Sequence, residues 1–246
     1  MKRILTILPI LSLIVMGCKR EPFADASISQ LQPYVGEYVT FKSYSTNTDY
    51  VEWDMDDGYT YDQPVIDHYF VDPGWYDVQL KAFGVKGGVD VAIFPVEVIG
   101  AQLTVVVKII TQEGVLTNIL LPNARVRLYP TLTAWEQETP LEVEGYTNSV
   151  GEVTFDNLSY QRYYIDVEKG YDFDNYTLAA EDVGWIETDM LEGIYLWTFE
   201  AYVDDYSTWL KSTSSSDRRK KALEAPATGD KRTPEGLSTK TPVKRK

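Results

Sequence analysis

The feature that most constrains the fold of this chain is an alternation of apolar and other residues in short segments. Residues 76–82 and 103–109 each place an apolar side chain at every second position. This period is typical of a β-strand with one buried face, because successive side chains on a strand point to opposite faces. Similar segments, separated by Gly, Pro, Asn and Asp at intervals of roughly 8–12 residues, fill residues 31–206, with no convincing run at helical period. We therefore predict an all-β protein built of β-sandwiches.

The length of this region indicates two modules. Its 176 residues are more than one seven-stranded sandwich requires. We expect two tandem sandwiches, one over residues 30–99 and one over residues 100–206. The junction is placed near Ile99 and Gly100 because Pro95 removes a backbone donor from the preceding strand, which marks that strand as an edge.

The N-terminus has the pattern of a cleaved signal peptide over residues 1–17. Lys2 and Arg3 precede an apolar run at residues 4–15. A run of this length spans only about 18 Å as a helix, whereas the hydrocarbon core of a bilayer is about 30 Å thick. A basic start followed by a short apolar run therefore indicates a secretory signal and not a membrane span.

The end of this segment carries a more specific pattern. Residues 15–18, Val-Met-Gly-Cys, resemble the bacterial lipobox, in which a lipidated cysteine becomes the first residue of the mature protein. The resemblance implies lipidation of Cys18, the single cysteine of the chain, and attachment to a membrane with residues 18–29 as a tether. Lys19 stands where enterobacterial inner-membrane lipoproteins carry Asp, which implies the outer membrane, on its periplasmic or its extracellular face.

The charge distribution separates the body of the chain from its C-terminal tail. Residues 21–210 carry 33 acidic and 8 basic residues, so we expect no nucleic-acid partner. Residues 211–246 carry 11 basic and 4 acidic residues and contain no aromatic residue. We expect the tail, residues 207–246, to be disordered because it can bury too little apolar surface to offset its ordering entropy. Its basic clusters could bind an anionic surface, or the tail could be solvated without a partner.

The composition excludes most familiar catalytic and metal-binding arrangements. One His and one Cys cannot supply a zinc site of His and Cys ligands or an intrachain disulfide. Catalysis would have to rest on carboxylates, most of which belong to solvated faces of strands and turns, so we expect no enzyme and no cofactor. Four carboxylates of the first module could gather calcium, but their spacing misses an EF-hand loop and we expect no metal site; they are Asp54, Asp56, Asp57 and Asp62.

Residues 30–99 contain three ordered motifs: WDMDDG at residues 53–58, HYF at residues 68–70 and PGWYDVQL at residues 73–80. They resemble the W-D-F-G-D-G, H-x-Y and P-G-x-Y-x-V-x-L elements of the polycystic kidney disease (PKD) domain. The resemblance implies an immunoglobulin-like β-sandwich. The main departure is Asp56, where the family usually has Gly.

The resemblance implies structural roles for seven residues: Trp53, Asp57, Gly58, His68, Phe70, Gly74 and Tyr76. The residues themselves indicate the same roles: Trp53 ends an alternating strand and suits a core between two sheets. Asp57-Gly58 is a tight-turn pair in which Gly supplies a positive φ. His68 could act as a ligand or a base, but its place in the family implies a structural histidine that bonds the neighbouring loop.

The second half also contains an ordered set of motifs, at residues 122–129 (PNARVRLY), 147–155 (TNSVGEVTF) and 163–167 (YYIDV). They resemble the prealbumin-like sandwiches grouped as carboxypeptidase-regulatory-like and collagen-adhesin B-type repeats. The resemblance implies an accessory module that carries no zinc ligands. Some relatives crosslink a first-strand Lys to a last-strand Asn, but residues 194–203 contain no Asn for Lys108, so we expect no such bond.

Aromatic residues outside the expected core are the candidates for binding. Trp75 points opposite to Tyr76 on its strand, and Tyr59 and Tyr61 follow the Asp57-Gly58 turn; Trp135 and Trp185 lie in loop-like segments. Exposed rings stack on sugars or anchor protein partners, so Tyr59, Tyr61 and Trp75 form a candidate ligand platform. We predict non-catalytic recognition or adhesion at the cell surface, with a glycan or an envelope protein as partner. The alternative is a structural spacer or scaffold subunit without a ligand of its own.

Overall fold

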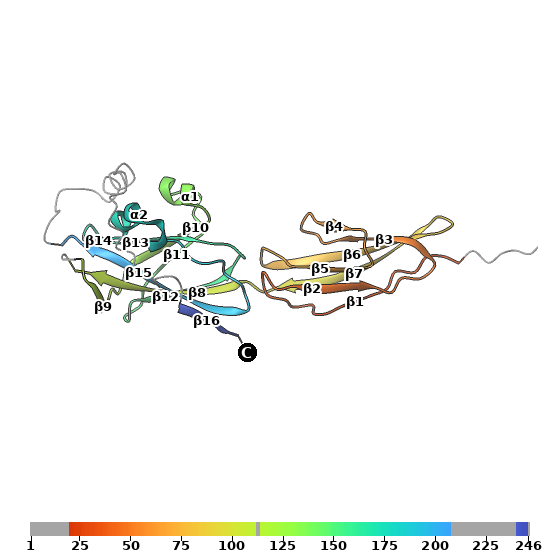
Figure 1. Ribbon diagram of the computed structural model, residues 1–246, viewed down its shortest axis with the longest axis horizontal. Coiled ribbons are helices and arrows are strands. Elements are labelled where there is room, and N and C mark those ends of the chain that lie inside the picture. Colours follow the sequence, from red (N-terminus) through yellow and green to blue (C-terminus); the bar gives the residue numbers. More distant parts are fainter. Residues whose placement is uncertain (1–19, 112–113, 208–239, 246) are drawn as a thin grey trace, which may run out of the picture.

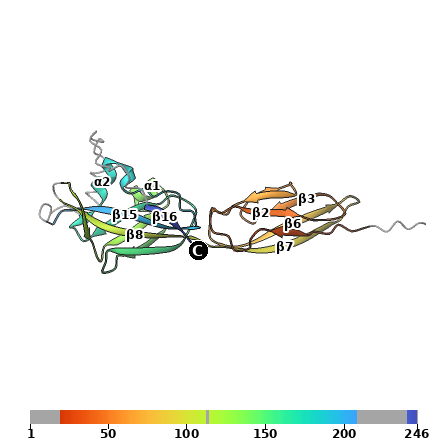
Figure 2. The same ribbon diagram turned by 60° about the horizontal axis from the view of Figure 1, so that its bottom comes forward.

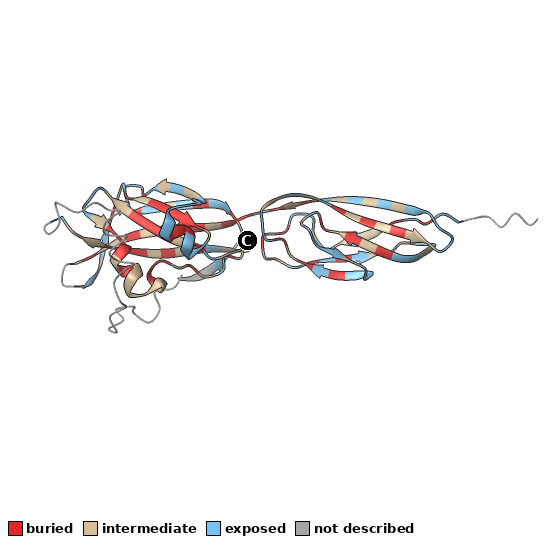
Figure 3. Ribbon diagram, turned by 90° about the horizontal axis from the view of Figure 1, so that it is seen from above, coloured by how far each residue is buried: buried red, intermediate tan, exposed pale blue. Residues whose placement is uncertain are grey.

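The computed structural model describes residues 20–111, 114–207 and 240–245. The predicted signal peptide at residues 1–17, the predicted lipidation site Cys18 and most of the tail lie outside the described residues. The described chain is all-β with two short α-helices, which confirms the predicted fold class, and it forms two lobes joined end to end (Figure 1). Buried and exposed residues alternate along many strands (Figure 3), as the period of the sequence requires.

The first lobe is a sandwich of seven strands: β1 (Ala26–Ile28), β2 (Val39–Ser43), β3 (Thr48–Asp54), β4 (Thr60–Tyr61), β5 (Val65–His68), β6 (Gly74–Gly84) and β7 (Val89–Val98). Its two antiparallel sheets have the orders β1-β2-β5 and β4-β3-β6-β7. Phe41 of one sheet and Leu80 of the other are fully buried in one core, where the Trp53 ring meets the Phe41 ring edge-to-face at 5.6 Å. The apolar residues of the alternating segments in the sequence therefore form this core.

The first lobe begins earlier than predicted. Residues 18–29 were expected to be a tether, but β1 pairs with β2 and a bridge joins Phe23 to Thr46. Ala24 is buried, and Ala26 and Ile28 pack against the core. The tether prediction is therefore wrong for this part, because every second residue from Ala24 to Ile28 is apolar and supports a short edge strand.

The second lobe contains the strands β8 (Ala101–Ile110), β9 (Leu116–Leu120), β10 (Arg125–Tyr129), β11 (Val143–Tyr146), β12 (Glu152–Leu158), β13 (Tyr164–Lys169), β14 (Phe173–Asp174), β15 (Tyr195–Asp205) and β16 (Lys240–Lys244). They belong to one sheet of order β11-β10-β13-β14-β15-β8-β12, with β9 beside β8 and β16 beside β15. Two layers, β11-β10-β13 and β15-β8-β12, bury their apolar residues in a common core and are joined through β14. The pair β8 and β15 is parallel.

Two helices and a 3-10 turn add a second small core outside this sandwich: α1 (Leu132–Gln137), α2 (Tyr176–Glu181) and η1 (Val183–Trp185). Trp135 and Trp185, expected as exposed loop residues, are buried there beside Tyr176 and Tyr202. That expectation is wrong because a helix of six residues, which carries Trp135, and a 3-10 turn of three, which carries Trp185, are too short to display a helical period. In the described part of the chain, no helix is long and apolar enough to cross a membrane.

The C-terminal strand corrects another prediction. The tail was expected to be disordered over residues 207–246, but Lys240–Lys244 forms β16 and pairs antiparallel with β15. The prediction is wrong for these residues because pairing with a sheet edge uses backbone groups and needs few apolar side chains. Residues 208–239 lie outside the described residues.

The two lobes contact each other at a joint after β7, which ends at Val98, before β8 begins at Ala101. The backbone N–H of Tyr160 donates to the Val71 carbonyl at 2.8 Å, and the N–H of Gly193 donates to the Val35 carbonyl at 2.9 Å. The Tyr160 ring also meets the Tyr69 ring edge-to-face at 5.7 Å. These contacts tie both lobes together at several points beyond the connecting chain.

Candidate ligand-binding groove

A groove of about 250 Å³ opens on the first lobe between the edge strands of its two sheets. β4 is the edge strand of one sheet and β5 is the edge strand of the other, so side chains of both converge between them. We call it the tyrosine groove; its lining residues are Tyr38, Tyr59, Tyr61, Asp67, His68, Tyr69 and Val71. The joint lies close by, because Tyr69 also contacts Tyr160 of the second lobe.

His68 forms the floor of the groove. The ring is buried, with Nε2 2.8 Å from Asp57 Oδ2 and Nδ1 3.0 Å from the Tyr61 hydroxyl. Burial, and then the Asp57 charge, raise the pKa of Tyr61, so this hydroxyl keeps its proton and can donate to Nδ1. Nε2–H is then left to donate to Asp57. His68 thus ties the 54–59 turn to β5, as a structural histidine does.

Two tyrosine rings stand at the open side of the groove. Tyr38 is 66% exposed and Tyr59 is 61% exposed. The Tyr38 ring is steadied by Tyr69, whose centroid lies 5.1 Å away in an edge-to-face arrangement, and Tyr59 lies 5.7 Å from His68. Asp67 adds a carboxylate that accepts a hydrogen bond from the Thr40 hydroxyl at 2.6 Å. The groove therefore combines exposed ring faces with hydrogen-bonding groups on a fixed floor.

The structure brings together only part of the predicted platform. Tyr59 and Tyr61 both line the groove, whereas Trp75 does not. Trp75 is 68% exposed on β6, beside Glu97 of β7. Tyr38 and Tyr69 also line the groove, although the sequence did not indicate them as binding residues. The outward position of Tyr38, directly before β2, is visible in the alternation, but its neighbours depend on which strands form the two edges.

The turn that carries Asp57 shows how the departure from the PKD pattern is accommodated. Asp56 adopts φ +62° and Gly58 adopts φ +95°. Asp is one of the few non-glycine residues that tolerate the left-handed region, so Asp56 can stand where the family has Gly. Its carboxylate accepts a hydrogen bond from the backbone N–H of Asp77 at 3.0 Å and fixes the turn to β6.

The remaining residues of the motifs that resemble those of the PKD domain serve the core and the joint end of the lobe. Trp53 and Phe70 are fully buried. The Tyr76 ring lies 4.4 Å from the Phe70 ring, and its hydroxyl donates to the Asp72 carbonyl at 2.8 Å. Gly74 has φ +149° at the start of β6. Trp53, Phe70 and Tyr76 thus pack in the lobe, and Gly74 supplies the backbone conformation that begins β6.

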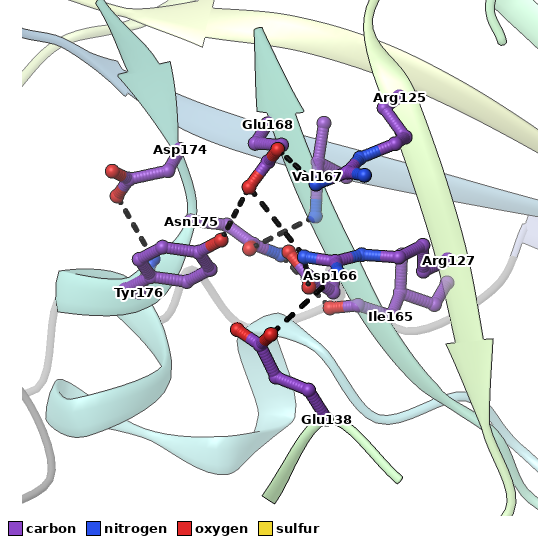
Figure 4. A network of polar contacts seen from close by, with 10 residues as sticks. All are labelled: Arg125, Arg127, Glu138, Ile165, Asp166, Val167, Glu168, Asp174, Asn175 and Tyr176. Carbon is purple, nitrogen blue, oxygen red and sulfur yellow. Dashed lines mark hydrogen bonds and ion pairs between the residues drawn. The ribbon is translucent and has the colours of Figure 1, made fainter. Parts of the chain in front are cut away.

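The second lobe contains a buried ionic network between its sheet and its helices (Figure 4). Arg127 and Asp166 are direct cross-strand partners on β10 and β13, with Arg127 Nη2 2.5 Å from Asp166 Oδ2. Glu168 pairs with Arg125 and accepts a hydrogen bond from the Tyr176 hydroxyl of α2 at 2.9 Å. This network was not predicted from the sequence, because a helix and two strands lie between β10 and β13 in the chain.

The network is stabilised by mutual pairing of its charges. Burial lowers the pKa of Arg127, but Asp166 and the neighbouring tyrosine and glutamate side chains together outweigh this effect, so the net shift is upward and Arg127 remains charged. Asp166 is fully buried. Because Arg127 and Asp166 face each other and Glu168 accepts from Tyr176 of α2, we assign the network to attachment of the helices.

A metal centre is not formed by the residues that the structure describes. Within these ranges, no group of three His, Cys, Asp or Glu side chains is placed to hold an ion. Asp57 is engaged by His68, and Asp56 is engaged by the backbone of β6. The acidic turn therefore acts through hydrogen bonds within the protein.

No protein-family model and no curated protein matches the chain. Among solved structures, the PKD1 domain of Vibrio anguillarum Epp is similar at 20% identity, over 32% of this chain and 94% of that domain, with a TM-score of 0.28. The PKD1 domain of the Vibrio cholerae metalloprotease PrtV is similar at 22% identity, over 32% of this chain and 98% of that domain, with a TM-score of 0.28. A carbohydrate-binding module of the β-sandwich superfamily is similar at 17% identity, over 56% of this chain and 85% of that module, with a TM-score of 0.31.

Proposed function

We propose that this chain is a non-catalytic lipoprotein of a bacterial outer membrane whose tyrosine groove binds a carbohydrate at the cell surface. The observation that carries the proposal is the pair of exposed rings, Tyr38 and Tyr59, beside a floor of hydrogen-bonding groups. Aromatic faces pack against the apolar faces of sugar rings, and fixed polar groups read the hydroxyls. Because His68 and Asp57 already hold the floor, little ordering is needed on binding.

The charge of the groove indicates which carbohydrates fit. Asp67 is its charged rim residue, and its lining residues include neither Lys nor Arg. The body around it is strongly acidic, with 33 acidic and 8 basic residues between positions 21 and 210. An acidic sugar would be repelled, so neutral oligosaccharides are the preferred class.

The position of the groove suits presentation from a lipid anchor. The described chain starts at the far end of the first lobe (Figure 1), where Pro22 lies against Gly84 at the end of β6. β6 is 11 residues long and spans about 36 Å toward the joint, where the groove lies. An anchor at Cys18 would thus leave the groove and the second lobe, which we take as a prealbumin-like spacer, away from the membrane.

Removing the two exposed rings tests the proposed site. In a panel of neutral and acidic oligosaccharides, the wild-type protein should bind neutral members, and the Y38A/Y59A variant should bind them about 10- to 100-fold more weakly. W75A, which removes an equally exposed ring outside the groove, is the matched control and should bind as the wild type does. Equal loss in both variants, or no binding to any oligosaccharide, would overturn the carbohydrate proposal.

Removing the cysteine tests the anchor. The C18S variant should move from the membrane fraction to the soluble fraction, because no lipid can then be attached. A T6A variant, altered in the apolar run but keeping the cysteine, should stay with the membrane.

Protease treatment of intact cells should digest the lobes of the wild-type protein, whereas full protection until lysis would contradict presentation at the surface.

The alternative function is that of a structural spacer or scaffold subunit without a ligand of its own. The contacts at the joint between the lobes favour this function. Backbone hydrogen bonds from Tyr160 and Gly193 hold the second lobe to the first, as a stiff spacer requires. A spacer has no need of the groove, so Y38A/Y59A would then leave every interaction of the protein unchanged. The binding measurement therefore separates the two functions.

A further inference from the structure

One edge of β15 receives the C-terminal strand of the chain. On one side, β15 pairs in parallel with β8 from Leu196 to Asp204. On the other side, β14 pairs near the end of β15, and β16 pairs near its beginning. Figure 2 shows this C-terminal segment at the surface beside the joint. The beginning of β15 is thus a sheet edge whose backbone groups accept an added strand.

The pairing of β16 is slight. Its register contains three residue pairs, interrupted by a shift, and Pro242 has no N–H to donate. At the central pair, Val243 is 66% exposed and Leu196 is 39% exposed, so little apolar surface is buried between them. A strand held by so few contacts can leave the edge readily.

Arg245 adds specificity at the end of this strand. Its backbone N–H donates to the Ile194 carbonyl at 2.8 Å, and Nη1 donates to the Gly100 carbonyl at 3.3 Å. The guanidinium also lies over the Tyr34 ring of the first lobe, 5.1 Å from its centroid. The edge of β15 together with the joint therefore recognises a short basic segment through the backbone and guanidinium of its arginine.

The connection to this strand is long. The 34 residues at positions 206–239 lie between β15 and β16. The advantage of an intramolecular partner falls as the connecting chain lengthens. The same segment on a second copy has identical complementarity, and the basic tail of one copy is attracted by the acidic body of another.

We infer that the edge of β15 at residues 195–198 is a docking site for the C-terminal strand, residues 240–245, of a second copy of this chain. The exchange would join the tail of one copy to the joint region of the next, in a head-to-tail contact that can repeat. This inference goes beyond carbohydrate binding and does not depend on it.

Disulfide trapping between two singly substituted chains tests the exchange. One chain carries L196C and the other carries V243C, both on a C18S background that leaves no other cysteine. Paired residues on adjacent antiparallel strands are close enough for a disulfide. After mixing and oxidation, the disulfide between positions 196 and 243 of different chains should form and increase with protein concentration, as measured by mass spectrometry of linked peptides.

Two controls make the result decisive. In the first control, the L196C chain is mixed with a chain that carries V85C, an exposed position at the far end of the first lobe, to measure disulfides from random collision. The yield of the 196–243 disulfide should be several-fold higher than the yield of the 196–85 disulfide. The L196C/V243C double variant measures docking within one chain. If this variant forms only intrachain disulfides and the mixed product stays at the level of the V85C control, or if neither product forms, the inference is wrong.

Discussion

Replacing Trp53 with alanine is expected to lower the free energy of unfolding of the first lobe by about 3–5 kcal/mol. Trp53 is among the largest fully buried side chains, between the two sheets, 5.6 Å from Phe41 and 6.4 Å from Phe94 by ring centroids. Its removal takes away apolar contacts and leaves a cavity that β-sheets cannot easily close. Urea unfolding followed by far-ultraviolet circular dichroism measures the change without depending on the lost fluorophore.

Trp75 supplies the matched control for this experiment. It is the same residue type in the same lobe, but it is exposed on β6. W75A should change the free energy of unfolding by no more than about 0.5 kcal/mol. Equal destabilisation by W53A and W75A would contradict the assignment of Trp53 to the core.

Replacing Asp166 with alanine is expected to cost about 3–5 kcal/mol in the second lobe. The substitution removes the carboxylate that faces Arg127 Nη2 at 2.5 Å and leaves the guanidinium in a buried site with less compensating charge. Thermal and urea unfolding would measure the loss. D172A, at an exposed position of the same lobe, should have little effect.

A double variant separates the attraction between Arg127 and Asp166 from the cost of burying their charges. In R127M/D166L both charges are replaced by apolar side chains, so the desolvation cost of the pair disappears with its attraction. We expect the double variant to be more stable than D166A, with strong coupling in the double-mutant cycle. If D166A is no less stable than the wild type, the network does not hold the helices to the sheet.

The core of the first lobe could be predicted from the sequence because the burial of a strand residue follows from its position in the alternation. Trp53 and Leu80 are inside and Trp75 is outside by parity alone. The positive φ of Gly58 could also be predicted, since few residues other than Gly suit such a turn. These are local properties, and neighbouring residues in the chain determine them.

The rest of the site depends on contacts between distant segments. Tyr38 and Tyr59 line one groove only because β4 and β5 lie at the edges of opposing sheets. Arg127 and Asp166 meet because β10 and β13 pair in one particular register. Sequence period specifies which face a residue occupies, but it does not specify which strand lies beside it.

The most direct test of the carbohydrate-binding groove is a nuclear magnetic resonance titration of the wild-type protein labelled on its tyrosine rings. The titrant is the oligosaccharide of the panel that binds most strongly. We expect the signals of Tyr38 and Tyr59 to shift, while those of Tyr146 and Tyr171, which are similarly exposed on the second lobe, stay in place. Shifts confined to Tyr146 and Tyr171, or a titration that moves no tyrosine signal, would contradict this expectation.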